Sequence, residues 1–172
     1  MCSLRDGRGP VSLEQSSPHS DGVYATDVPT QLTFRPARTQ DFEYCKRLCF
    51  AGMERIIDEL NLDRNAQETS FEEQWELTQV RVLMVDGSDV GWIQSIKRKD
   101  ELFLAQLFVD GPFQGRGIGT RAMHQLLAEA GTDGNAVCLG VAKINPALRL
   151  YERLGFRITG EDERKFYMRR DP

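Results

Sequence analysis

Three glycines at alternate positions lie between a short apolar segment and the start of a helical pattern. The apolar run from Leu102 to Val109 ends at turn residues, which is typical of a buried strand. From Ile118 onward, apolar residues recur at helical spacing. Gly115, Gly117 and Gly119 remove side chains from the turn where the first helical amides lack partners and the helix dipole is positive. Exposed amides in such a turn predict a phosphate-binding loop.

Three kinds of phosphate ligand compete for this loop. A dinucleotide fingerprint needs glycine at its sixth position, but counting from Gly115 that position is Thr120. A P-loop ends in Gly-Lys-Ser/Thr, and no lysine follows these glycines. The third pattern, Gln/Arg-x-x-Gly-x-Gly/Ala, is filled by Gln114, Gly117 and Gly119. The loop therefore resembles the coenzyme A pyrophosphate loop of the GNAT superfamily, the acyl-CoA-dependent N-acyltransferases.

A second motif supports this resemblance. The segment from Asn145 to Phe156 is similar to the family's later Asn…Tyr…Gly-Phe pattern, with Tyr151 at the tyrosine position. Asn145 suits a helix N-cap, Pro146 the first helical position, and Gly155 a left-handed C-cap before a new strand at Phe156. A short packing helix explains these residues equally well, so the resemblance depends on the two motifs occurring in succession. It covers about Leu32 to Arg170.

The resemblance implies the fold and the cofactor site. The expected fold is an α/β single domain with a GNAT-like mixed, mostly antiparallel central sheet and about four flanking helices. The strand before the loop and the strand after its helix would splay apart and admit the pantetheine arm. Asn145 would contact the cofactor or only cap its own helix. The implied cofactor residues are Leu107, Phe108, Val109, Gln114, Gly115, Arg116, Gly117, Ile118, Gly119, Thr120 and Asn145.

The implied reaction is direct attack of a primary amine on the thioester of acetyl-CoA in a ternary complex, without an acyl-enzyme and without a metal. Tyr151 matches the family tyrosine that acts as general acid. Proton transfer from an ordinary tyrosine to the thiolate is uphill by about 2 kcal/mol. We therefore expect Tyr151 mainly to hydrogen-bond the developing thiolate. The competing interpretation is an aromatic side chain that only packs in the core.

The motifs do not assign a general base, because Gln106 stands where many relatives carry a glutamate. Glutamine cannot accept the proton, so either another carboxylate works through water or the acceptor amine has a low pKa. Glu54 is the candidate base, and Asp58, Glu72 and Glu73 lie in the same helical region. Any of these carboxylates could act as a base or anchor a cation, but each is more typical of a solvated helix face.

Two other functions remain open. A non-catalytic acyl-CoA-binding module would explain Gln106, and a nucleotide-binding protein could use the same loop. The expected partner is a small-molecule or peptide amine, selected by the region from Met53 to Leu77. Trp75, Trp92 and Tyr167 could line the acceptor pocket or pack in the core.

Length and composition limit the class of protein. The chain has 172 residues, enough for one domain, and we expect a flexible tail over 1–30 followed by a GNAT N-acetyltransferase domain over 31–172. The net charge of −4, without runs of like charge, disfavours nucleic-acid binding. No apolar stretch reaches the roughly 20 residues of a membrane span, and no signal-peptide core is present. The sequence thus predicts a cytoplasmic protein without a membrane partner. A homodimer is possible, since proteins that the chain resembles commonly dimerise.

The cysteines do not predict a metal site. Cys45 and Cys49 are four residues apart on an apolar helix face and could form half a site. No second pair follows at ligand spacing, and the only histidines are His19 and His124. We therefore interpret the two cysteines as buried structural thiols.

The remaining pattern supplies the elements that would position these groups. An edge strand is expected first, followed by two helices, a hairpin turning at Asp86-Gly87, and the strand that enters the glycine loop. The resulting order is β-α-α-β-β-β-α-β-α-β-β, with strands expected at 32–36, 80–85, 90–97, 102–109, 137–141, 156–160 and 165–169 and early helices at 42–60 and 67–77.

Overall fold

The structure, a computed structural model, describes residues 31–172, and the predicted tail over 1–30 lies outside the described residues. Within this range, one seven-stranded sheet is formed by β1 (Leu32–Pro36), β2 (Val80–Val85), β3 (Ser88–Lys97), β4 (Glu101–Val109), β5 (Ala136–Ala142), β6 (Arg157–Glu161) and β7 (Lys165–Arg170). The helices are α1 (Phe42–Glu59), α2 (Arg64–Gln74), α3 (Ile118–Thr132) and α4 (Leu148–Arg153), with 3-10 turns η1 (Thr39–Asp41), η2 (Leu77–Gln79) and η3 (Gly111–Phe113). The element order agrees with the sequence prediction.

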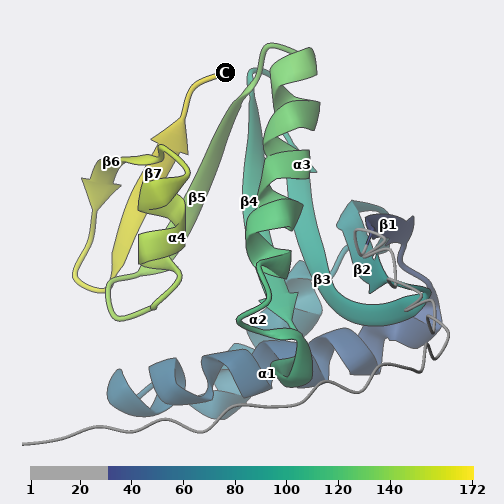
Figure 1. The fold of residues 1–172 in the computed structure, drawn as a ribbon. Coiled ribbons are helices and arrows are strands. Elements are labelled where there is room, and N and C mark those ends of the chain that lie inside the picture. Colours follow the sequence, from purple (N-terminus) through teal and green to yellow (C-terminus); the bar gives the residue numbers. More distant parts are fainter. Residues whose placement is uncertain (1–30) are drawn as a thin grey trace, which may run out of the picture.

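The strands lie in the order β1-β2-β3-β4-β5-β7-β6, with β1 at one edge as predicted. All neighbouring strands are antiparallel except β4 and β5, which are parallel and joined through α3. A parallel pair requires such a crossover connection. Figure 1 shows α3 along one face of the sheet and α1 at the end toward which β4 and β5 diverge. The expected mixed, mostly antiparallel sheet is confirmed.

Two apolar cores cover the two faces of the sheet. Ile93 belongs to the core that contains the buried side of α3, and its neighbour Trp92 belongs to the core formed with α1 and α2. Successive strand residues point to opposite faces, so this alternation assigns each helix layer to one side. The second core is aromatic and contacts the far half of β4 through Phe108.

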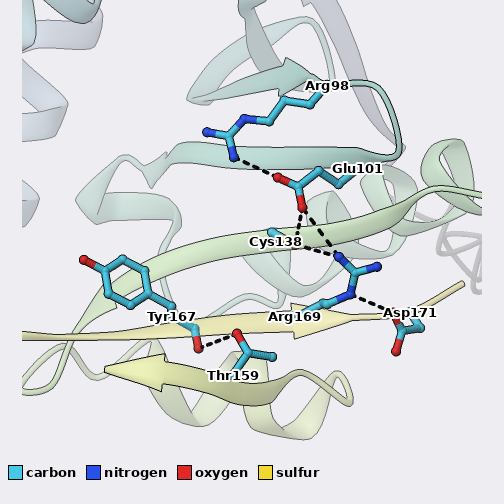
Figure 2. A network of polar contacts seen from close by, with 7 residues as sticks. All are labelled: Arg98, Glu101, Cys138, Thr159, Tyr167, Arg169 and Asp171. Carbon is cyan, nitrogen blue, oxygen red and sulfur yellow. Dashed lines mark hydrogen bonds and ion pairs between the residues drawn. The ribbon is translucent and has the colours of Figure 1, made fainter. Parts of the chain in front are cut away.

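A polar cluster fastens the paired end of β4 and β5 (Figure 2). The Glu101 carboxylate accepts from the Cys138 thiol at 3.1 Å and from Arg98 Nη1 at 2.8 Å, and these donors lower its pKa. Arg169 Nη1 lies 3.5 Å from the same carboxylate, and its Nε donates to Asp171 at 2.8 Å. Groups from β4, β5 and β7 are therefore joined at the end opposite to the point where β4 and β5 separate.

Helix boundaries account for most of the differences from the sequence prediction. The second helix was expected over 67–77, but α2 begins at Arg64 because the Asp63 carboxylate caps it, accepting from the Ala66 amide at 2.9 Å. It ends at Gln74, and Leu77–Gln79 form η2. The predicted hairpin turn is confirmed, with positive φ angles of 50° at Asp86 and 78° at Gly87.

Cys45 and Cys49 are both buried in the α1–α2 core, which confirms their interpretation as structural thiols. Burial raises the pKa of each thiol to about 12. In the part of the chain that the structure describes, no cluster of three or more His, Cys, Asp or Glu side chains is arranged to hold a metal ion. None of the helices in that part is long and apolar enough to cross a bilayer.

Candidate functional site

The glycine loop has the backbone conformation that its sequence predicts. After β4, the Asp110 carboxylate accepts from the Gly111 amide at 2.8 Å and starts η3. Gly115 and Gly117 then adopt φ angles of 72° and 74°, a region that strongly favours glycine. Gly117 is the N-cap of α3. Two of the three glycines are therefore required by backbone geometry alone.

The start of α3 presents unpaired amides. Arg121 N is the first helical amide to donate back, to Gly117 O at 3.0 Å. Among residues 31–172, no group accepts from the amides of Gly117, Ile118, Gly119 or Thr120. Together with the positive end of the helix dipole, these amides form a site suited to an anion such as pyrophosphate.

The side chains around the loop differ in what they can offer a ligand. Ile118 is only 3% exposed, so its amide alone is available. A Cβ on Gly119 would meet Leu150 at 3.9 Å, an ordinary contact, so the protein itself leaves room at this position. Arg116 is exposed, with its guanidinium carbon 5.6 Å from the centre of the Phe113 ring. It adds positive charge beside the free amides.

The strands β4 and β5 separate beyond four paired residues. Pairing runs from Glu101 opposite Ala136 to Leu104 opposite Leu139 and stops there. The register between β3 and β4 shifts at Ala105, which makes a bulge at the same point. Residues 106–109 of β4 continue to pair with β3 but have no partner on β5 (Figure 1).

The unpaired segment of β4 contains three of the predicted cofactor residues. Leu107 and Val109 are half-buried against the α3 core, and Phe108 points to the opposite face. Val109 O already accepts from Gln114 Nε2 at 2.8 Å, which ties the loop to the strand end. A carbonyl oxygen has a second lone pair, so this strand edge still offers hydrogen-bonding groups to an extended ligand.

Tyr151 lies on α4, on the α3 side of the sheet. Its side chain is 8% exposed and packs edge-on against Phe156 at 5.8 Å between ring centres. Burial raises the pKa of Tyr151 to about 12. The hydroxyl therefore stays protonated near neutral pH and can only donate or accept a hydrogen bond there.

Asn145 forms a turn rather than the N-cap of a regular helix. Its side-chain oxygen accepts from the Ala147 amide at 2.9 Å, and its backbone oxygen accepts from the Leu148 amide at 3.0 Å. The helix was expected to start at Pro146, but α4 begins at Leu148 because this turn occupies the first residues. Its predicted end is correct: Gly155 has φ 85°, and the Phe156 amide donates to Tyr151 O at 3.1 Å.

The predicted acidic residues do not form a buried base. Glu54 and Asp58 are exposed on α1, and Glu73 is exposed on α2. Glu72 is also exposed and accepts from Lys46 Nζ at 2.9 Å. Glu54 as the catalytic base therefore stays a prediction without a supporting contact.

Sequence reasoning missed two features of the α1–α2 face. Gln94 is 3% exposed, and its side-chain nitrogen donates to Gln74 O at 2.8 Å and to Gln79 Oε1 at 3.3 Å. A Cβ on Gly52 would lie 2.8 Å from the Phe108 ring, so glycine lets α1 approach β4 closely. Both features depend on contacts between distant segments, so no local sequence pattern predicts them.

The three aromatic residues expected near the acceptor have different environments. Trp92 is fully buried and stacks at a tilt on Phe108 at 5.5 Å, so it is a core residue. Trp75 is half-buried in the same cluster. Tyr167 is 44% exposed on β7, and its hydroxyl donates to Asp162 at 2.7 Å.

Comparison with known proteins agrees with this geometry. Residues 76–158, which include the loop and the Asn145–Phe156 segment, match the model of the acetyltransferase (GNAT) domain. The chain therefore contains a GNAT acetyltransferase domain. It is similar to an uncharacterised N-acetyltransferase of Methanocaldococcus jannaschii, with 36% identity over 70 residues covering 40% of this chain and 31% of that protein.

Two further proteins are similar to this chain. A spore coat polysaccharide biosynthesis protein of Bacillus subtilis is 26% identical over 122 residues, 66% of this chain and 41% of that protein. The chain thus spans less than half the length of either curated relative. The PaiA N-acetyltransferase of Thermoplasma acidophilum, solved in complex with coenzyme A, has a TM-score of 0.70 at 14% identity. The similarity covers 83% of this chain and 99% of that protein.

Proposed function

We propose that this GNAT chain is an N-acetyltransferase that transfers the acetyl group of acetyl-CoA to a primary amine. The observation that carries the proposal is the combination of an unpaired β4 edge with a loop of free amides at its end. An extended pantetheine arm ending in a pyrophosphate has the shape and charge that such a site accepts. The solved complex of a structural neighbour with coenzyme A supports the choice of ligand.

The chain's own residues suggest how acetyl-CoA is held. The amides of Gly117, Ile118, Gly119 and Thr120, with the charge of Arg116, would bind the pyrophosphate. Backbone groups of residues 107–109 would bind the pantetheine arm along the open edge of β4. The thioester would then lie between β4 and β5, beyond the point where their pairing ends.

The proposed reaction is a single displacement through a tetrahedral intermediate. The lone pair of a neutral amine forms a C–N bond to the thioester carbonyl carbon, and the C–S bond then breaks. The amine nitrogen loses one proton to solvent or a base, and the thiolate gains one proton, so amide and free CoA thiol are the products. The Tyr151 hydroxyl would donate a hydrogen bond to the sulfur as negative charge develops on it.

A non-catalytic acyl-CoA-binding module is the second candidate. It is favoured by Gln106 and by the exposed positions of the acidic residues on α1 and α2. Such a module would bind acetyl-CoA without transferring its acyl group to any amine.

Release of CoA thiol from acetyl-CoA, measured with a panel of amines, separates the two candidates. The enzyme proposal predicts amine-dependent release with saturation in both substrates, together with a mass increase of the acceptor by one acetyl group. Tight acetyl-CoA binding without release above the amine-free rate would instead support the binding module.

A further inference from the structure

This inference rests on the proposed function and names the class of amine that the site accepts. It starts from the part of the sheet that we call the acceptor face, formed by Trp92, Gln94, Gln106 and Phe108. In the register of β3 and β4, Trp92 lies opposite Phe108 and Gln94 opposite Gln106. Paired residues of adjacent strands point to the same side, and residues two apart along β4 share that side. Gln106 therefore faces the α1–α2 layer, beside the open edge of β4.

The acceptor face and the proposed acid lie on opposite sides of the sheet. Tyr151 belongs to the α3 core, whereas Trp92 and Phe108 belong to the α1–α2 core. A thioester held between β4 and β5 would thus meet its leaving-group partner on one side. The amine would approach from the other side, past Gln106.

Gln94 is a buried, uncharged residue of the acceptor face, and hydrogen bonds hold its side chain in place. The side chain is buried, and its nitrogen uses both hydrogens, toward Gln74 O at the end of α2 and Gln79 Oε1 in η2. These bonds fasten the segment between α2 and β2 to the sheet. Beside it, the Gln106 amide is half-buried, and no group within residues 31–172 forms a hydrogen bond with it.

No carboxylate is held on the acceptor face. Within the described range, four acidic side chains are buried or half-buried, and each is paired with a cation: Asp41 with Arg35, Glu68 with Lys46, Glu101 with Arg98 and Asp110 with Arg47. The acidic residues of α1 and α2 considered above are exposed. A general base must reach the amine within about 3.2 Å or through one water molecule. The acceptor face thus supplies a neutral hydrogen-bonding group and aromatic surface, but no group that takes a proton from an ammonium ion.

We propose that the acceptor is an α-amino group, as at the N-terminus of a peptide, and that Gln106 selects it over the ε-amino group of lysine. The Gln106 side-chain oxygen would accept an N–H of the uncharged amine and leave the nitrogen lone pair directed at the thioester. Because glutamine does not remove a proton, the amine must arrive uncharged. The rate then follows the uncharged fraction of each amine in solution.

Reference acidities set the size of the preference. At pH 7, an α-amino group with a pKa of about 7.8 is roughly 14% uncharged, whereas a lysine amine with a pKa of about 10.4 is about 0.04% uncharged. The ratio of the two fractions is about 350. The greater nucleophilicity of the more basic amine reduces this advantage, so we expect a preference on the order of 100-fold in kcat/KM at pH 7.

The test compares two peptides of identical sequence that differ only in which amine is available. One has a free N-terminus and a blocked lysine side chain; the other has a blocked N-terminus and a free lysine side chain. CoA thiol release is followed from pH 6.5 to 9. The rate with the first peptide should level off above about pH 8, whereas the rate with the second should rise about tenfold per pH unit over the whole range.

A Gln106→Glu variant tests the residue itself. The added carboxylate should act as a base and raise kcat/KM for the lysine peptide at pH 7 at least tenfold, which narrows the preference. Gln106→Ala, which removes the amide without adding a base, should not raise it. Gln40→Glu adds the same charge at an exposed position in η1 and should leave both rates unchanged.

Each outcome has a definite meaning. Equal or faster transfer to the lysine peptide by the wild-type protein at pH 7 would overturn the inference and leave the proposed acetyltransferase intact. An unchanged preference in a folded Gln106→Glu variant would overturn the role of Gln106. Absence of transfer to either peptide, with acetyl-CoA bound, would overturn this inference; absence of transfer to the whole panel of amines as well would overturn the proposed function.

Discussion

Replacing Tyr151 with phenylalanine removes one hydroxyl and retains the ring. The ring packs in the α3 core and contacts Phe156 edge-on at 5.8 Å, and phenylalanine preserves both interactions. The free energy of unfolding should therefore change by less than about 1 kcal/mol, the usual net value of one hydrogen bond. Any larger loss of activity then reports on chemistry rather than on folding.

The size of the effect follows from the acidity of the buried hydroxyl. With its pKa raised to about 12, Tyr151 is a weaker acid than the thiol of CoA. Full proton transfer to a thiolate with a reference pKa near 8.5 would be uphill by about 5 kcal/mol. The useful contribution is a hydrogen bond to the charged sulfur, which is worth about 1.5–3 kcal/mol. Tyr151→Phe should lower kcat by roughly 10- to 150-fold.

The assay is steady-state release of CoA thiol, combined with calorimetric binding of acetyl-CoA. We expect kcat to fall while the Kd of acetyl-CoA stays within about threefold, since the ring that lines the site remains. Tyr44→Phe is the matched control, because the Tyr44 hydroxyl is buried without a partner among the described residues. Full kcat in a Tyr151→Phe variant that still binds acetyl-CoA would refute the assigned hydrogen bond.

Three further predictions follow from the loop, from α1 and from the buried thiols. Gly117→Ala should weaken acetyl-CoA binding at least tenfold in calorimetry, because Gly117 has a φ of 74° that alanine adopts only with strain. Gly134→Ala is the control: its φ is 69° but it lies outside the loop, so both variants should lose about 1–2 kcal/mol of stability while only Gly117→Ala changes the Kd. Gly52→Ala places a Cβ 2.8 Å from the facing phenylalanine ring, so it should lower stability by about 1–3 kcal/mol and raise the KM of the amine; an unchanged KM would contradict the placement of the acceptor. The pKa of each thiol of Cys45 and Cys49 rises from 9.0 to about 12 on burial, so their stabilising contribution is complete below pH 9 and is lost as pH rises toward 12. Urea unfolding at pH 10.5 should show a loss of about 2 kcal/mol for each thiol, about 4 kcal/mol in total, and a Cys45→Ala variant should lose only about 2 kcal/mol.

Features encoded over a few neighbouring residues could be predicted from the sequence. Gly115 and Gly117 were expected to open an exposed turn before a helix, and both have positive φ angles there. Gly155 likewise ends α4 in the left-handed conformation. These conformations depend on the missing Cβ and on local hydrogen bonds, so the residue type carries most of the information.

Features that depend on contacts between distant segments could not be predicted from local patterns. The splaying of β4 and β5 was expected from family resemblance alone, and the register places its start after Leu104, at the bulge of Ala105. The pairing of Gln94 with Gln106 is likewise a matter of strand register. A shift of one residue would have turned both side chains to the other face, and no local signal determines that choice.

The most direct test of the account is thermal unfolding of the wild-type protein with acetyl-CoA, CoA, NAD or ATP added separately. A ligand at 100 times its Kd adds about 2.7 kcal/mol to stability, which for a chain of this size raises Tm by about 5–10 °C. We predict that acetyl-CoA and CoA both raise Tm, and that NAD and ATP at the same concentration do not. A shift with NAD or ATP and none with either CoA species would contradict the assignment of the loop and of the open β4 edge to acyl-CoA.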